Sequence, residues 1–274
     1  MKLSVLFENA PGENKSLEYG HGLSLLIEFD GRKILFDTAS GPAFLRNAKR
    51  MGIDLSDLDA VMLSHSHYDH ASGFRDLLEE GFEVPSLFVG KGFFDKKYKK
   101  RGCVYSDLSA GWGMDLPTRY GVPLCTIEGT KEISPSVFLF QGFSRTDRME
   151  SVPDSFVKEV DGKIVKDDFS DEIALGVSTD NGIVLVVGCS HPGIINIVNH
   201  VERVSGKNVF ALIGGIHLKD EGKERIDHVL ECLSERNISV LGLCHCTGVE
   251  TKKAADKFPG LELTTISTGD VLFF

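Results

Sequence analysis

Four side chains that bind metals lie within one short segment, from His65 to His70, which reads His-Ser-His-Tyr-Asp-His. The segment follows an apolar run at 60–63 that predicts a buried strand. Imidazoles and a carboxylate crowded at a strand end need a cation, because uncompensated polar groups there would be costly. Successive side chains of an extended backbone point to opposite sides, so His65 and His67, which are two residues apart, would reach one metal ion. Asp69 and the last histidine would reach a second ion, and we predict a metal site rather than a histidine-rich surface turn.

Three later histidines also follow apolar runs. His191, His217 and His245 come after the runs at 184–187, 210–213 and 240–243. Because α/β sheets place their chemistry at the carboxyl ends of strands, we expect these side chains to converge on the pocket of the first cluster. A single histidine after a strand is more often structural, but three of them beside a chelating cluster indicate function.

The order of these motifs along the chain resembles the metallo-β-lactamase superfamily, a set of αββα metalloenzymes. The resemblance implies that His191 completes the metal site of the first two histidines of the motif. It implies equally that His245 completes the site of Asp69 and His70. The implied cofactor is two divalent metal ions, with zinc first and manganese or iron as the other choices.

The resemblance also suggests roles for residues around the ligands. Asp37 matches an Asp-Thr-Gly position of the family, where it would hold a ligand imidazole in the right tautomer, or cap the following turn. Asp69 and His217 are the candidate catalytic residues, although His217 would contact substrate, orient a ligand or form part of the wall. His21, in a loop before a strand, is expected to contact substrate.

Cys189 marks a departure from the family pattern. Members usually carry a Gly-Asp after the strand of their second hairpin, and that aspartate bridges the two metals. The nearest match here is Gly188-Cys189. Cys189 would be either a thiolate ligand or a small buried residue that leaves the bridging to water, and both readings stay open.

Other residues of ligand type are expected to be structural. His200 and His228 fall within helical patterns and are predicted to lie on the surface. Cys244 and Cys246 flank a histidine, but the sequence has no second cysteine pair at suitable spacing for a zinc knuckle, so they are predicted to pack in the core.

Alternating strands and helices would position these residues. The pattern predicts an α/β (α+β) fold of the αββα type, with two mixed sheets flanked by helices in a single domain over 1–274. Hairpins are predicted at 23–37 and 173–187, and helices at 42–51, 71–80, 193–204 and 223–236.

Two segments break this pattern. Residues 91–121 are rich in lysine, glycine and aromatic residues, and we expect an insertion or lid there. The polar stretch 144–171 predicts a long mobile loop with room for one short hairpin. The basic run Lys96–Arg101 would be a solvated helix face or, within the lid, an attractor of phosphate.

Composition limits the possible functions. The chain has 274 residues and a formal net charge of −10, which argues against a nucleic-acid partner. No apolar run reaches membrane-spanning length, and the apolar run at the first residues is too short for a signal peptide. The six cysteines show no disulfide framework. We expect a cytoplasmic protein without a membrane partner, and the oligomeric state stays open.

Three functions fit these residues. The first is hydrolysis of an anionic, phosphorylated small molecule, because zinc lowers the pKa of water to about 7 and positive charge stabilises oxyanions. The second follows from segments such as Gly214-Gly215-Ile216-His217, which look like the branch containing archaeal dihydropterin-ribofuranosylaminobenzene phosphate synthases. That branch implies displacement of pyrophosphate from a pterin. The third is a catalytically silent ligand-binding protein that contains metal.

Overall fold

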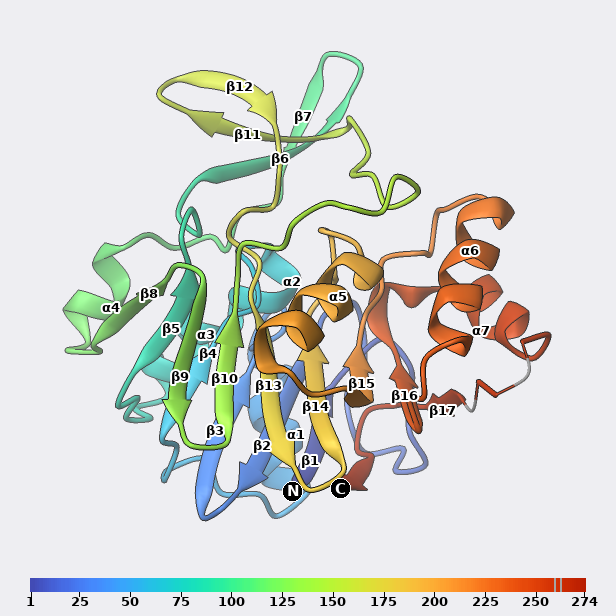
Figure 1. Cartoon of the computed structure of the whole chain (residues 1–274). Helices are drawn as coiled ribbons and strands as arrows, with labels where there is room; N and C mark the ends of the chain where they lie inside the picture. The colour runs from blue at the N-terminus through green and yellow to red at the C-terminus, as the bar shows by residue number, and fades with distance from the viewer. Residues whose placement is uncertain (259, 262) are drawn as a thin grey trace. The chain divides into compact units, whose positions relative to one another are not determined.

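The computed structural model describes residues 1–258, 260–261 and 263–274. Contacts between residues divide the chain into two compact units. Figure 1 labels the helices and strands that each unit contains. The first unit comprises Met1–Thr126, Pro153–Asp167 and Ser267–Phe274, and the second comprises Ile127–Val152 and Asp168–Ile266. A single domain over residues 1–274 stays a prediction.

The first unit is built on a seven-stranded sheet in the order β18-β1-β2-β3-β4-β5-β8. Strands β1 to β3 are antiparallel neighbours, whereas β4 and β5 run parallel to β3. The strands of this sheet are β1 (Lys2–Phe7), β2 (Ser24–Phe29), β3 (Arg32–Phe36), β4 (Ala60–Met62), β5 (Leu87–Gly90), β8 (Leu124–Ile127) and β18 (Val271–Phe273). The helices of the unit are α1 (Ala43–Arg50), α2 (Tyr68–Ala71), α3 (Gly73–Glu79) and α4 (Asp115–Arg119).

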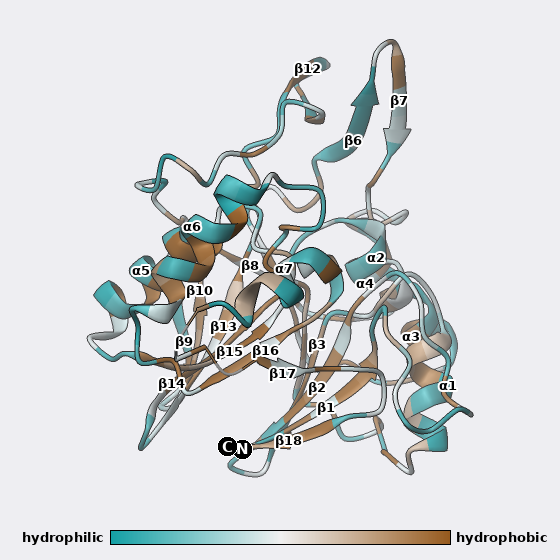
Figure 2. Ribbon diagram, turned by 90° about the vertical axis from the view of Figure 1, so that its right-hand side faces the viewer, coloured by the Kyte–Doolittle hydropathy of each residue, from teal (hydrophilic) through white to brown (hydrophobic). Residues whose placement is uncertain are grey.

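Helices α1 and α3 cover one face of this sheet. Phe44 of α1 and Phe74 of α3 belong to one buried cluster with Leu26, Leu35 and Val61 of the strands. The apolar residues of α1 recur at helical spacing, so one stripe of the helix is buried while its lysine and arginine residues stay outside. Figure 2 shows the same contrast, with β1 and β2 in brown and the outer turns of α1 in teal.

Both irregular segments of the sequence contribute to a second, four-stranded sheet in the first unit. Its order is β12-β11-β6-β7. The strands are β6 (Lys96–Arg101), β7 (Val104–Asp107), β11 (Phe156–Val160) and β12 (Lys163–Lys166). The basic run is therefore a strand, shown in teal in Figure 2, and the expectation of a helix face was wrong. Whether this small sheet acts as a lid stays a prediction.

The basic strand β6 is tied into the first unit by a buried ion pair. Lys97 Nζ lies 3.1 Å from Asp167 Oδ2, and each side chain is 1% exposed. Leu108, the residue directly after β7, contacts the histidine motif, because its carbonyl oxygen accepts the backbone N–H of Tyr68 at 2.8 Å. The small sheet is thus anchored at its base beside the motif.

The second unit contains the other seven-stranded sheet, in the order β17-β16-β15-β14-β13-β10-β9. Strands β14 to β17 run parallel to one another, and β13 pairs with β14 as an antiparallel hairpin. The strands are β9 (Thr130–Ser134), β10 (Val137–Phe140), β13 (Ala174–Thr179), β14 (Gly182–Val187), β15 (Val209–Gly214), β16 (Val240–Leu243) and β17 (Leu263–Thr265). The helices are α5 (Ile194–Ser205), α6 (Lys223–Ser234), η1 (His245–Thr247) and α7 (Val249–Ala255).

Helices α5 and α6 pack on this sheet through apolar faces. Ile197 and Val201 of α5, and Val229 and Leu233 of α6, share one buried cluster with Leu212 of β15. The predicted hairpin at 173–187 and the helices at 193–204 and 223–236 match β13, β14, α5 and α6 to within a few residues. Among residues 1–258, 260–261 and 263–274, no helix is long and apolar enough to cross a membrane.

The turn after β15 depends on glycine. Gly214 has φ +130°, and a Cβ there would lie 2.0 Å from Val187 O on the neighbouring strand. We predict that Gly214→Ala lowers the free energy of unfolding in urea by more than about 3 kcal/mol. Gly206→Ala is the matched control, because its φ is +67° with open space around it, so it should cost only about 1–2 kcal/mol. Equal losses in the two variants would contradict the role of this close approach.

Candidate metal-binding residues

The histidine motif of the first unit follows β4 and forms a buried cluster. The ring centroids of His65 and His67 are 4.6 Å apart, and those of His65 and His70 are 4.3 Å apart. Asp69 Oδ2 lies 3.8 Å from His70 Nε2. All four side chains are buried, whereas the side chains of a histidine-rich surface turn would be exposed.

Asp37 fixes the orientation of His70. It lies just after β3, is fully buried, and its Oδ2 is 2.6 Å from His70 Nδ1. It also accepts hydrogen bonds from the backbone N–H and the hydroxyl of Ser64, at 2.7 and 2.8 Å. A carboxylate in this position keeps the proton on Nδ1, so a metal would bind through Nε2. The contact is the one that the predicted role of Asp37 requires.

The same carboxylate acts on His65 through Ser64. The Ser64 hydroxyl donates to Asp37 and lies 2.9 Å from His65 Nδ1. Because the hydroxyl has a single proton, it must accept from Nδ1 of His65, which places the tautomer of that imidazole as well. Ser64 is a residue that sequence reasoning missed, although it stands between the apolar run and His65.

Burial keeps His65 in the form that binds metals. Burial lowers the pKa of His65 well below its ordinary value, and the neighbouring His70 and His67 lower it further. The neutral imidazole is the ligand form, so no proton has to leave this ring before a metal binds at neutral pH.

His21 contacts the carboxylate of the motif. Its Nε2 lies 3.0 Å from Asp69 Oδ2, and its side chain is 52% exposed. The loop approaches the motif closely at Gly22, where a Cβ would meet Asp69 O at 2.7 Å. His21 is therefore placed beside a predicted ligand with half its surface exposed, and its role in substrate binding stays a prediction.

In the second unit, the three parallel strands β14, β15 and β16 bring the later candidates together. Cys189 Sγ lies within 4.8 Å of a ring nitrogen of His191 and of His245. The ring of His217 lies 4.5 Å from that of His191. The thiol is thus close to both predicted histidine ligands of this unit, which gives the reading of Cys189 as a ligand a geometric basis.

Glu172 holds His191 as Asp37 holds His70, and sequence reasoning missed it. Its Oε2 lies 2.9 Å from His191 Nδ1 and accepts the His191 backbone N–H at 3.0 Å. Its Oε1 accepts the backbone N–H of Ser190. The ring of Phe169 stacks on the ring of His191, with ring centroids 3.8 Å apart. In the sequence, Glu172 is an acidic residue two positions before the buried strand β13, which is only a weak signal.

Several of these positions have a left-handed backbone that non-glycine residues rarely adopt. The φ angles are 59° at Asp37, 60° at Ser190, 49° at His217 and 51° at His245. Each such residue costs about 1–3 kcal/mol, and such strain collects at functional sites. At these strand ends the backbone conformation is locally unfavourable, and we infer that it serves to orient the side chains.

The two groups of donors suit divalent metals. Nδ1 of three imidazoles is engaged by a carboxylate or by Ser64, which directs metal binding to Nε2. Nitrogen, oxygen and sulfur donors of this kind fit zinc, and without the thiol they fit manganese and iron as well. Metal binding by residues of this chain thus fits the donor chemistry.

Cys244, Cys246 and His200 lie in the core of the second unit. Cys246 Sγ is 3.6 Å from Cys189 O, and both Cys244 and Cys246 are buried, in keeping with the predicted packing. His200 is also buried, with its ring 5.2 Å from that of Phe143, so its predicted place on the surface was wrong. The cause is the apolar face of α5, which includes His200.

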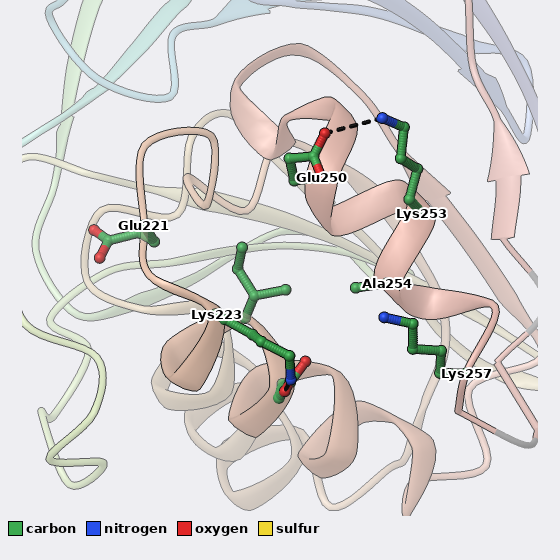
Figure 3. Close-up of a pocket in the computed structure, with 8 residues that line it drawn as sticks. Glu221, Lys223, Glu250, Lys253, Ala254 and Lys257 are labelled. Carbon is green, nitrogen blue, oxygen red and sulfur yellow. Dashed lines mark hydrogen bonds and ion pairs between the residues drawn. The ribbon is translucent and has the colours of Figure 1, made fainter.

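A groove of about 310 Å³ between α6 and α7 contains none of the predicted site residues (Figure 3). Three lysines and three acidic residues line it, and Lys253 pairs with Glu250 at 3.0 Å. Lys223 pairs with Asp227 in the same groove. These charges compensate one another, so the groove offers no net charge that would select a ligand.

Comparison with known proteins gives the same family from sequence and from structure. Residues 18–101 match the family model described as the metallo-β-lactamase superfamily. The 7,8-dihydropterin-6-methyl-4-(β-D-ribofuranosyl)-aminobenzene-5'-phosphate synthase of Methanocaldococcus jannaschii is 30% identical over 267 residues, which cover 92% of this chain and 89% of the relative.

Solved structures extend the match to the whole fold. A structure described as Tm1679, a metal-dependent hydrolase of the β-lactamase superfamily, aligns with a TM-score of 0.85 and 28% identity over 100% of this chain and 99% of the other. A diphosphatase from the PhnP family aligns over 100% and 97%, with a TM-score of 0.55 and 13% identity, which shows the fold alone. The α/β fold predicted from the motif order is confirmed.

Proposed function

The chain belongs to the metallo-β-lactamase superfamily and is an enzyme, and from this premise we propose that it hydrolyses an anionic, phosphorylated small molecule with two divalent metal ions. The proposed ligands are the predicted ones: His65, His67, Asp69, His70, His191 and His245, with Cys189 as a further ligand. Zinc is the first choice of metal, because the donors are mostly imidazoles.

One observation carries this proposal. Within each unit, a buried carboxylate fixes a candidate ligand imidazole, Asp37 on His70 at 2.6 Å and Glu172 on His191 at 2.9 Å. Burying a carboxylate costs free energy unless it is well hydrogen-bonded, and each of these accepts three hydrogen bonds. Such support for the ring orientation is what metal ligands need, and a structural histidine does not require it.

The donor set also supports an anionic substrate. Six of the proposed ligands are five imidazoles and a single carboxylate, Asp69, so most of the positive charge of the ions would stay uncompensated. When bound, such ions polarise a phosphoryl oxygen as Lewis acids and lower the pKa of water. His21 would hold the carboxylate of Asp69 through the contact at 3.0 Å, and His217 stands beside His191 for contact with substrate.

The hydrolytic reading is supported by Tm1679, whose description is a metal-dependent hydrolase and which is 28% identical to this chain. The test is turnover of a phosphodiester such as bis(p-nitrophenyl) phosphate, and of phosphomonoesters, by protein loaded with zinc, manganese or iron. We expect hydrolysis with at least one metal and none in the metal-stripped protein. Lack of turnover of every ester with every metal would contradict hydrolysis.

A second candidate is a pterin transferase. It is supported by the 30% identity to the M. jannaschii synthase, which extends over 92% of this chain. In this reaction the arylamine nitrogen would form a bond to the methylene carbon of the pterin, and the bond to the pyrophosphate oxygen would break. Release of pyrophosphate from a dihydropterin pyrophosphate only when the arylamine is present would favour this function over hydrolysis. No release in its presence would exclude it.

Cys189→Ala tests the thiolate ligand. Because Cys189 Sγ lies within 4.8 Å of a ring nitrogen of both His191 and His245, we predict that the variant holds about one metal equivalent less per chain than wild type. Elemental analysis of both proteins, purified side by side, measures the difference. Cys125→Ala, at a half-buried cysteine of β8, is the control. An unchanged metal content in Cys189→Ala would leave the residue a packing role.

A further inference from the structure

A second group of metal-binding side chains lies in the second unit, apart from the candidate ligands described above. His228 and Cys232 are one helical turn apart on α6, so both point to the same side of the helix. Asp147 approaches them from the segment that follows β10. We propose that Asp147, His228 and Cys232 bind a zinc ion that clasps this segment to α6.

The three donor atoms converge. Asp147 Oδ2 lies 2.8 Å from His228 Nε2, and Cys232 Sγ lies 3.8 Å from the same nitrogen. All three donors lie within 4.8 Å of one another. Zinc bonds of about 2.0–2.3 Å in a tetrahedron separate donors by about 3.3–3.8 Å, so binding requires Asp147 to move back by about half an ångström. Water would take the fourth position.

The convergence on one nitrogen excludes a catalytic relay. In a cysteine–histidine–aspartate triad, the thiol and the carboxylate contact opposite nitrogens of the imidazole, so that a proton can pass across the ring. Here both contacts fall on Nε2 of His228. A single ring nitrogen cannot donate to the carboxylate and accept from the thiol at once, whereas a cation satisfies an oxygen, a nitrogen and a sulfur donor together.

Asp147 is held in place before any metal binds. Its Oδ1 accepts the backbone N–H of Met149 at 2.8 Å, which turns Oδ2 towards α6. Its own backbone N–H donates to Asn196 Oδ1 at 2.9 Å, near the start of α5. Glu150, which directly follows Met149, accepts the backbone N–H groups of Ile195 and Asn196 at the same helix end. The carboxylate therefore stands on a fixed loop, as a metal ligand must.

The surroundings of the cluster suit zinc. His228 is 30% and Asp147 15% exposed at the side chain, so an ion could enter from solvent while the donors stay partly shielded. A mixed set of oxygen, nitrogen and sulfur donors selects zinc over magnesium or calcium. Burial raises the pKa of the Cys232 thiol, so zinc binding would displace its proton. The helical pattern predicted only a surface position for His228, and the proposed zinc site would give this residue a further role.

The test compares Cys232→Ser with Cys103→Ser, a change at an exposed cysteine. Both proteins are loaded with zinc, dialysed and analysed for zinc per chain. We expect Cys232→Ser to hold about one equivalent less than wild type, and Cys103→Ser to match wild type. Phosphodiester turnover should be similar in all three, because the cluster lies outside the proposed catalytic residues. Equal zinc contents in Cys232→Ser and wild type would overturn the proposal.

Two further measurements separate a zinc clasp from an ordinary ion pair of Asp147 and His228. A chelator should lower the midpoint of thermal unfolding more in Cys103→Ser than in Cys232→Ser, because only the former has this ion to lose. Cobalt substitution in a Cys189→Ser background should give a thiolate-to-cobalt absorption band that disappears when Cys232→Ser is added. Equal chelator effects and an unchanged spectrum would leave only the ion pair.

Discussion

His67→Ala is expected to lower turnover of the substrate by about three orders of magnitude or more. His67 is 6% exposed, and its ring lies 4.6 Å from that of His65 in the cluster after β4. Loss of one imidazole would remove a ligand of the proposed metal ions, and several kcal/mol of transition-state stabilisation with it. The measurement is kcat/KM for the best phosphoester substrate, together with metal content per chain.

Tyr68→Phe is the matched control for that variant. Tyr68 lies between two members of the motif and is 37% exposed, so its change removes one hydroxyl and no ligand. We expect nearly wild-type turnover and metal content. Activity in a folded His67→Ala protein within tenfold of wild type would contradict the role of the motif, and circular dichroism shows whether the variant is folded.

Asp37→Asn and Glu172→Gln are expected to lower metal affinity or activity by about 10- to 100-fold each. Each change keeps the size of the side chain but places an amide where a carboxylate now accepts from an imidazole Nδ1, at 2.6 Å on His70 and 2.9 Å on His191. The wrong tautomer is then favoured, and Nε2 is no longer the free donor for a metal. Competition with a chromogenic chelator measures the affinity.

The control for these variants is Asp59→Asn. Asp59 also accepts a backbone N–H, that of Lys33 at 2.7 Å, but it lies on the exposed side of the first unit. We expect unchanged metal affinity. The two test variants would also lose stability, because both carboxylates are buried and each accepts three hydrogen bonds. Loss of stability with unchanged metal affinity would show that Asp37 and Glu172 serve the fold and not the metal.

Local sequence was sufficient to find the core of the candidate site. Four ligand side chains within six residues need only the strand before them and the loop after them, and both are short-range features. The later histidines were found in the same way, because His191, His217 and His245 each follow an apolar run that forms a strand of the second unit. Because β14, β15 and β16 run parallel to one another, their carboxyl ends, and the three histidines that follow them, lie at the same end of that sheet.

The supporting residues depend on the path of the chain, and sequence alone does not reveal it. Glu172 contacts His191 across 19 residues of sequence. Ser64 acts on His65 only because Asp37, 27 residues earlier, lies just after the neighbouring strand β3. Asp37 was predicted because its motif resembles that of the family. Glu172 has no such motif, and an acidic residue at the end of a polar stretch looks like any solvated side chain.

The small sheet was hidden for a different reason. Its strands come from two segments about fifty residues apart, and strand β6 consists mostly of lysine and arginine. The buried pair of Lys97 and Asp167 joins the two segments, but each of these residues in the sequence looks like a surface charge. A strand whose partner is distant and whose residues are charged has no apolar alternation from which to predict it.

The most direct test of the account is phosphoester turnover by one sample of the protein before chelation, after chelation and after addition of zinc, with metal content measured at each stage. The account predicts turnover that falls to background when the metal is removed and returns when zinc is restored. Turnover that persists in protein shown by elemental analysis to be free of metal would contradict it.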